Sequence, residues 1–218
     1  MSPVATLPSP PVRDSVAGCF LTLVRRTRAL APRLAPGVER EGLLLLLAVG
    51  EIAAWTAGAF AGLPDRREGA GVPLDAAELI RRALQRAAPA MRSLATQTRV
   101  RSIAGAIPVA GPCDGLVRGL TIAVGCAAVA SGSGGTVGLD VAVEGRRLSV
   151  AVRGRGREGL SRQPPLPFSP APVVAALLAR EGGRVRAGGG SPPRSWRLDV
   201  PLAFGAPRTG EGLVASFP

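Results

Sequence analysis

The stretch SGSGGTVGLDVAVEGRRLSVAV, residues 131–152, decides the fold. It opens on a glycine-rich turn, and apolar residues then alternate with polar or small ones on both sides of Glu144-Gly145-Arg146. Such alternation places every second side chain on one face of a strand, and a central Gly favours a tight turn. The apolar series is Val137, Leu139, Val141 and Val143 before the turn and Leu148, Val150 and Val152 after it. The stretch therefore predicts a β-hairpin with one buried face.

Helices and further strands flank this hairpin. Before it, Asp75 and Glu78 form a capping-box pattern that opens a helix, a short strand is predicted at 99–104, and residues 115–130 read as an apolar helix. After it, we expect a loop over 154–167, a helix over 173–180 and two strands near 184–187 and 196–200. This order predicts an α/β two-layer sandwich over residues 71–205 and an unstructured tail over 206–218.

The N-terminal third has a different pattern. Residues 1–13 are proline-rich and read as a flexible leader. Apolar residues then recur at helical spacing from Ser15 to Leu30, prolines interrupt them, and a second apolar segment follows. We expect a helical hairpin over 14–70 that dimerises as a four-helix bundle. The first helix has one wide apolar stripe and the second is apolar all round, so the two are too apolar to be covered within one hairpin. The predicted fold class is therefore α+β, with an N-terminal hairpin followed by the sandwich.

The segment from Leu43 to Leu63 is long enough to span a membrane, and its one charge is Glu51. A carboxylate at the centre of a bilayer costs about 2.5–3.5 kcal/mol, which makes a membrane-anchored protein the less favoured alternative. Cys19, Cys113 and Cys126 lie among apolar neighbours and have no metal-ligand spacing. We read them as buried free thiols in a reducing compartment and expect a cytoplasmic protein.

The composition excludes several kinds of chemistry. The chain has no His and no Tyr, and the printed sequence also contains no Lys and no Asn, so all 27 basic residues are Arg. Without these side chains it cannot build a Ser/His/Asp triad, a His-containing zinc site, a Schiff base or a P-loop. The net charge of +12 arises from arginines scattered along a chain with 3% aromatic residues, so we expect no nucleic-acid partner.

The order of elements resembles the histidine kinases of two-component signalling, in which a dimerisation hairpin precedes a Bergerat-type (GHKL) ATP-binding domain. Four stretches carry the resemblance in the family's order: residues 73–84, 134–137, 176–185 and 198–202. The hairpin is most similar to the subfamily whose phosphoacceptor motif reads His-Arg-Val-Lys-Asn. In that register, the acceptor histidine falls at Pro10.

The residues that the family uses for catalysis are missing. The family needs a phosphoacceptor His, a magnesium-binding Asn in the helix matching 115–130 and an adenine-binding Asp in a glycine-rich loop. Arg153-Gly154-Arg155-Gly156-Arg157 stands at the place of that loop, with Gly154 at the position of the Asp, and Ser169-Pro170-Ala171-Pro172 replaces the turn that caps the phosphates. We therefore expect no catalytic residues, no cofactor and no metal, and we regard residues 153–157 as a vestigial loop.

The resemblance implies a catalytically degenerate signalling protein that binds as a homodimer to a response-regulator receiver domain or to a histidine kinase. In the family, receiver domains dock low on the first hairpin helix, which here implies Ser15, Cys19, Thr22 and Arg26. Two alternatives stay open. One is an enzyme of the same superfamily with a rearranged site that uses Glu51, Asp114 or Glu158 as base, and the other is the membrane-anchored protein.

Overall fold

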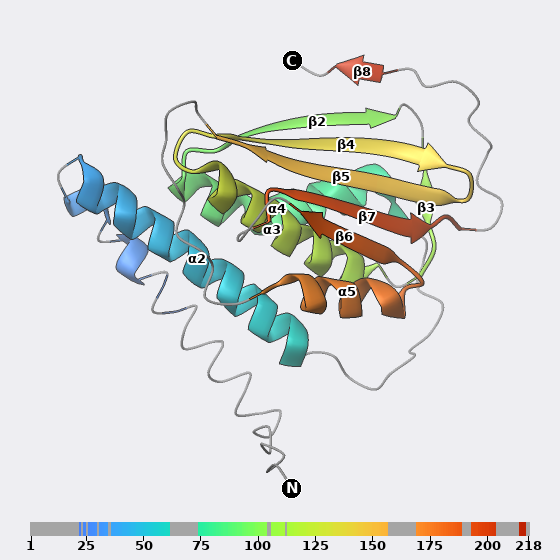
Figure 1. Cartoon of the computed structure of the whole chain (residues 1–218), viewed down its shortest axis with the longest axis horizontal. Helices are drawn as coiled ribbons and strands as arrows, with labels where there is room; N and C mark the ends of the chain where they lie inside the picture. Colours follow the sequence, from blue (N-terminus) through green and yellow to red (C-terminus); the bar gives the residue numbers. More distant parts are fainter. Residues whose placement is uncertain are drawn as a thin grey trace, which may run out of the picture.

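The computed structural model of the chain describes residues 22, 24, 26–29, 31–34, 36–61, 74–103, 106–111, 113–156, 169–188, 193–203 and 214–216. Among them, a twisted sheet carries three helices on one face, and a fourth long helix lies across those three (Figure 1). The helices are α2 (Val38–Ala61), α3 (Ala76–Ser93), α4 (Asp114–Ser131) and α5 (Ala171–Arg180), preceded by the 3-10 turn η1 (Ala31–Arg33). The expected sandwich of sheet and helices is confirmed.

The main sheet has the strand order β6-β7-β5-β4-β2-β8. Its strands are β2 (Gln97–Ile103), β4 (Thr136–Glu144), β5 (Arg147–Arg155), β6 (Arg184–Gly188), β7 (Ser195–Pro201) and β8 (Val214–Ser216). β2 and β4 run parallel, because α4 crosses between them, and the other neighbours are antiparallel. A second, two-stranded sheet joins β1 (Leu74–Asp75) to β3 (Pro108–Val109). The hairpin predicted from residues 131–152 is formed by β4 and β5.

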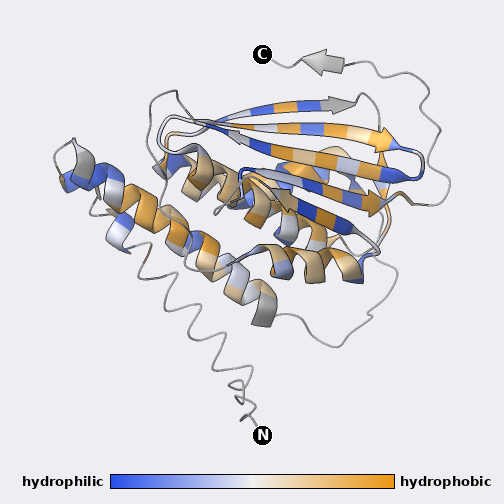
Figure 2. Ribbon diagram, viewed as in Figure 1, coloured by the Kyte–Doolittle hydropathy of each residue, from blue (hydrophilic) through white to orange (hydrophobic). Residues whose placement is uncertain are grey.

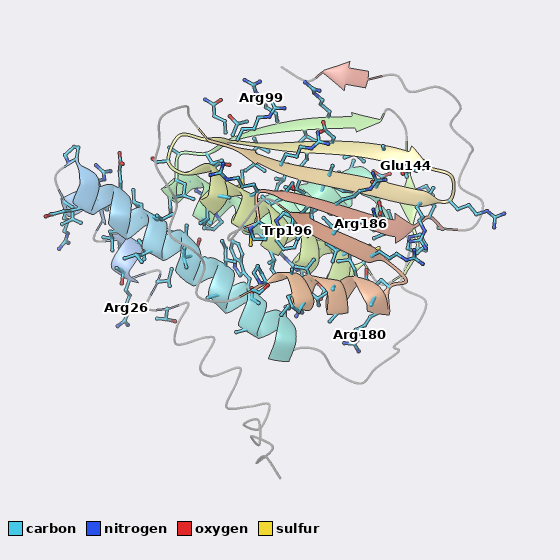
Figure 3. All side chains as sticks on the ribbon, in the orientation of Figure 1. Arg26, Arg99, Glu144, Arg180, Arg186 and Trp196 are labelled. Atoms are coloured by element: carbon cyan, nitrogen blue, oxygen red, sulfur yellow. The ribbon has the colours of Figure 1, made fainter. Side chains whose placement is uncertain are left out.

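The alternating pattern decides which face of the sheet is covered. In β4, Val137, Leu139 and Val141 are buried toward the helices, and in β7 Trp196, Leu198 and Val200 are buried. Figure 2 shows the resulting alternation of hydrophilic and hydrophobic residues along the strands. In Figure 3, Trp196 lies between the sheet and the helices, whereas Arg99 lies on the outer side of β2. Arg186 and Glu144 are exposed as well. The opposite face of the sheet carries the strands' arginines and carboxylates.

Helix α3 begins at the expected N-cap, Asp75, but the expected capping box with Glu78 does not form. The Asp75 carboxylate accepts a hydrogen bond from the Ala77 N–H at 3.0 Å and a second from the Ile107 N–H at 2.7 Å. Glu78 does not complete the box, since its carboxylate binds Arg81 and Arg82 one turn further on. Those two guanidinium groups lower the pKa of Glu78 to about 2.

The helix α2 lies where a second N-terminal helix was expected, and it packs against α3, α4 and α5 of the same chain. Its buried residues include Leu47, Ala48, Ile52 and Ala59. Part of the apolar surface that we expected to require a second copy is therefore covered within one chain. Leu46 remains 68% exposed. Of the expected first helix, the described residues Thr22, Val24 and 26–29 are helical, while Ser15 and Cys19 lie outside the described residues.

Three local expectations were wrong or incomplete. The tail was expected to be unstructured, yet Val214–Ser216 pairs with β2 as an edge strand, because the backbone of β2 offers free hydrogen-bonding groups there. The loop expected from residue 154 begins later, since β5 continues to Arg155. The strand expected at 99–104 begins earlier and spans Gln97–Ile103.

Two helices in the described part of the chain are long and apolar enough to cross a membrane, within Glu39–Ala59 and Asp114–Ser131. α4 is the centre of the helical layer, and 83% of its apolar window is buried inside the chain. For α2 the buried share is 39%. The apolar character of α4 is thus explained by its place in the core, whereas that of α2 is explained only in part.

Candidate functional site

Of the stretch 153–157, expected to be a vestigial loop, the described residues lie at the C-terminal end of β5, where Gly154 approaches the last turns of α4. A Cβ atom built on Gly154 would lie 2.4 Å from the Ala127 carbonyl oxygen and 2.7 Å from the Ser131 hydroxyl oxygen. Both distances are far below van der Waals contact, and one of the atoms is backbone. A side chain at position 154, where the resemblance led us to look for an adenine-binding Asp, would therefore require the backbone of α4 to move.

The two described arginines of this loop point away from α4. Gly154 faces the helices, and side chains alternate along a strand, so Arg153 and Arg155 project from the opposite face of the sheet. There they line a shallow groove of about 220 Å³ with Arg99 and Arg101 of β2. Asp140 lies in the same groove, and its carboxylate is 3.1 Å from the Arg153 guanidinium. Arg157 and Glu158 lie outside the described residues.

The helix α4 presents no free ligand for a magnesium ion. Its side chains from Gly119 to Ser131 are buried, and none of them is a carboxylate or an amide. The hydroxyl of Thr121 donates to the Val117 carbonyl at 2.7 Å, and that of Ser131 donates to the Ala127 carbonyl at 2.6 Å. Cys126 is fully buried, and burial raises the pKa of its thiol. Among the described residues, no three Cys, Asp or Glu side chains gather as a metal site.

The contact between α4 and α5 is equally close. A Cβ on Gly119 would lie 2.7 Å from Leu178 Cδ1, and one on Gly115 would lie 2.7 Å from Glu181 Oε1. The Glu181 carboxylate caps α4 by accepting the N–H groups of Gly115 at 2.8 Å and Leu116 at 3.2 Å. Burial raises the pKa of Glu181 to about 7, although those two hydrogen bonds act in the opposite direction. No sequence pattern pointed to Glu181, because its partner Gly115 lies 66 residues earlier in the chain.

The residues expected to dock a receiver domain are described only in part. Thr22 and Arg26 are exposed on one helical segment, and Figure 3 shows Arg26 away from the sheet. Ser15 and Cys19 lie outside the described residues, so their position relative to this pair stays a prediction.

Two of the three carboxylates considered as a catalytic base are engaged with arginines. Glu51 is buried, and its Oε1 is 2.5 Å from Nη1 of Arg28 on the preceding helical segment. Asp114 is exposed and pairs with Arg118 at 2.7 Å and Arg86 at 3.5 Å. The third, Glu158, lies outside the described residues.

Comparison with known proteins supports the family resemblance through structure alone. No protein-family model and no curated protein matches the sequence. Full-length ShkA, crystallised with AMPPNP, is 18% identical, with a TM-score of 0.52 over 92% of this chain and 47% of ShkA. A histidine kinase from Burkholderia phymatum is 15% identical, with a TM-score of 0.50 over 89% of this chain and 98% of that protein.

The histidine kinase AdeS of Acinetobacter baumannii is 12% identical, with a TM-score of 0.50 over 84% of this chain and 95% of AdeS. At such identities a structural likeness establishes the fold and leaves activity open. The α/β sandwich expected from the order of motifs is confirmed, and its fold is similar to that of histidine kinases.

Proposed function

We propose that this chain is a catalytically degenerate histidine-kinase-like protein that acts in the cytoplasm by binding a receiver domain or a histidine kinase. The observation that carries the proposal is the packing at Gly154. The family's nucleotide site needs a carboxylate there, and the Ala127 carbonyl occupies the space that its Cβ would take.

The rest of the nucleotide site supports the same proposal. α4 offers no carboxylate or amide among its buried side chains, and Arg153 and Arg155 project from the far face of the sheet. Phosphoryl transfer depends on positioning the triphosphate and neutralising its charge through a metal and nearby donors. A chain that lacks the metal ligand, the adenine acceptor and the phosphoacceptor His retains the fold as a scaffold for binding.

Calorimetry with ATP and Mg²⁺ on the full chain tests the loss of the nucleotide site. We expect no binding tighter than about 100 µM, which corresponds to roughly 5.5 kcal/mol. Tighter, Mg²⁺-dependent binding would overturn the proposal. Binding that needs no Mg²⁺, disappears with salt and is lost in a double Arg153→Gln, Arg155→Gln variant would identify the arginine groove as an anion patch and leave the proposal standing.

Titration of receiver domains encoded by the same genome tests the binding role. The immobilised full chain should bind at least one of them, and Arg26→Glu should weaken that binding at least about fivefold, because it reverses an exposed charge on the proposed surface. Arg33→Glu is the matched control, since Arg33 is also exposed but lies in η1. Equal losses in both variants would contradict the proposed docking surface. Failure of every receiver and kinase domain would contradict the binding role itself.

A further inference from the structure

A cavity of about 670 Å³ lies between α2, α3 and α4. Its apolar wall is formed by Trp55, Ala54 and Ala59 of α2 and by Pro89 of α3. The volume is within the range of small-molecule sites, which are largely apolar with a few polar groups that fix orientation. This cavity is on the side of α4 that carries Arg118 and Thr121, away from the side that packs on α5 at Gly119.

The rim of the cavity is positively charged. Arg86 and Arg92 reach it from α3, and Arg118 reaches it from α4. Asp114 pairs with Arg86 and Arg118, so its single charge is shared between two guanidinium groups. Among the described residues, no carboxylate pairs with Arg92. The rim therefore has an excess of positive charge and an unpaired guanidinium that can bind an anion.

The inner wall holds a buried acceptor without a donor. The side chain of Glu51 is only 6% exposed, and one of its oxygens is held by Arg28. Its other oxygen, Oε2, receives no hydrogen bond from any described residue. A buried carboxylate oxygen is normally satisfied, because an unmade hydrogen bond there costs about 1–3 kcal/mol. The neighbouring Arg28 also has two buried donors, Nε and Nη2, that bind no described residue. Because Oε2 of Glu51 is itself buried, a ligand reaches this acceptor only when the Glu51 side chain turns toward the cavity.

We propose that this cavity binds a small aromatic anion that also carries a hydrogen-bond donor. The anionic group binds the guanidinium rim, the ring packs beside the half-buried indole of Trp55, and the donor reaches Oε2 of Glu51. The charge, the ring and the donor of the ligand thus correspond to the arginines of the rim, the indole of Trp55 and the carboxylate of Glu51. The site does not depend on the proposed partner binding, and it lies apart from Gly154.

Trp55 provides a direct probe, because the chain has only one other tryptophan, the core residue Trp196. In a Trp196→Phe variant of the full chain, phenylacetate should shift the Trp55 emission and saturate below about 1 mM. Acetate lacks the ring and 2-phenylethanol lacks the charge, so each should bind at least about tenfold more weakly.

Arg92→Gln should weaken phenylacetate binding about five- to tenfold, because it removes the unpaired guanidinium of the rim. Arg99→Gln is the matched control, since it removes an equally exposed arginine from β2 and lowers the net charge by the same amount. It should leave the affinity unchanged. A lack of saturation up to about 10 mM, or equal effects of the two substitutions, would overturn the site.

Calorimetry with 4-hydroxyphenylacetate tests the role of Glu51. Its hydroxyl should strengthen binding about fivefold or more relative to phenylacetate, because a buried donor meets a charged acceptor. The gain should shrink in Glu51→Gln, whose amide offers a neutral oxygen, while phenylacetate binding in that variant should not weaken. Identical affinities for the two ligands in the unchanged chain would show that Oε2 of Glu51 receives no donor, and this part of the proposal would be wrong.

Discussion

Position 154 requires glycine, because the backbone of β5 lies too close to α4 there for any side chain. Gly154→Asp would restore the family's carboxylate in the sequence, but it would force a charge against the Ala127 carbonyl. We expect the variant to gain no ATP affinity and to lose about 2–4 kcal/mol of unfolding free energy through overpacking and an unsatisfied buried charge.

Urea denaturation and ATP calorimetry check this prediction. Gly138→Asp in β4 is the matched control, since a Cβ there would meet its nearest neighbour, the Arg153 carbonyl oxygen, only at 3.9 Å. Gly138→Asp should lower the unfolding free energy by well under half as much as Gly154→Asp does. Mg²⁺-dependent ATP binding by Gly154→Asp would show that the backbone yields and that the site can be rebuilt.

Glu181 makes the stability of the fold depend on pH near neutrality. Its pKa rises from 4.5 in an unperturbed carboxyl to about 7 in the folded chain, chiefly through burial. A raised pKa means that the folded state binds the proton more tightly, so the stabilisation is complete below about pH 4.5 and is lost as the pH rises through about 7.

Urea denaturation at pH 5 and pH 8 measures this loss against Glu181→Gln. The unchanged chain should lose about 1 kcal/mol more than the variant over that interval, a value reduced for the water that still reaches the carboxyl. If both proteins change equally, the titration of Glu181 is not coupled to folding. A larger loss of unfolding free energy in Glu181→Gln would contradict the predicted direction of the pKa shift.

At the scale of the element, the docking of α2 on α4 depends on Gly125. A Cβ at this position would lie 2.9 Å from Trp55 Cζ3 and 3.0 Å from Ile52 Cγ1. Gly125→Leu should therefore push α2 away and lower the unfolding free energy by about 1–3 kcal/mol, although leucine is the better helix former. The displaced Trp55 should show a red-shifted emission in the Trp196→Phe background.

Gly58→Ala is the matched control on α2, because nothing lies within 4 Å of the Cβ that it would add. It should raise the unfolding free energy by about 0.5–1 kcal/mol through helix propensity alone. An unchanged emission and a raised stability in Gly125→Leu would show that α2 does not rest on α4 in solution.

At the scale of the whole molecule, dimerisation remains a prediction. The structure leaves less of the apolar surface of α2 for a second copy to cover than the sequence suggested. α2 buries part of its apolar surface within one chain, and Leu46 is the most exposed large apolar side chain among its described residues. Leu46→Asp should convert a dimer into a monomer by light scattering at micromolar concentration, without lowering the melting temperature, because the side chain contributes little to the monomer's core.

Ala175→Asp, on an exposed position of α5, is the control for adding one carboxylate to a helix surface. It should leave the mass unchanged. A monomeric parent chain, or a dimer that survives Leu46→Asp, would exclude the four-helix bundle centred on this part of α2.

The sequence by itself determined the local features of this protein. Strict alternation in residues 136–152 specified the hairpin and its buried face, because the side-chain period of a strand is two. The Asp75 cap and the apolar run of α4 were likewise readable from spacing alone. The absence of His, Lys and Asn excludes most catalytic chemistry whatever the fold, since no fold can supply a missing functional group.

Only the tertiary structure decided which surfaces meet. The sequence marks α2 as apolar, but periodicity does not say whether a second copy or α4 covers it. Arg28 and Glu51, Gly154 and Ala127, and Glu181 and the start of α4 are far apart in the chain, so no local pattern records their contacts. The first of these contacts lines the cavity beside Trp55, and the second leaves no room for a side chain at position 154. Only folding brings these groups together, since their separation along the chain carries no signal of their distance in space.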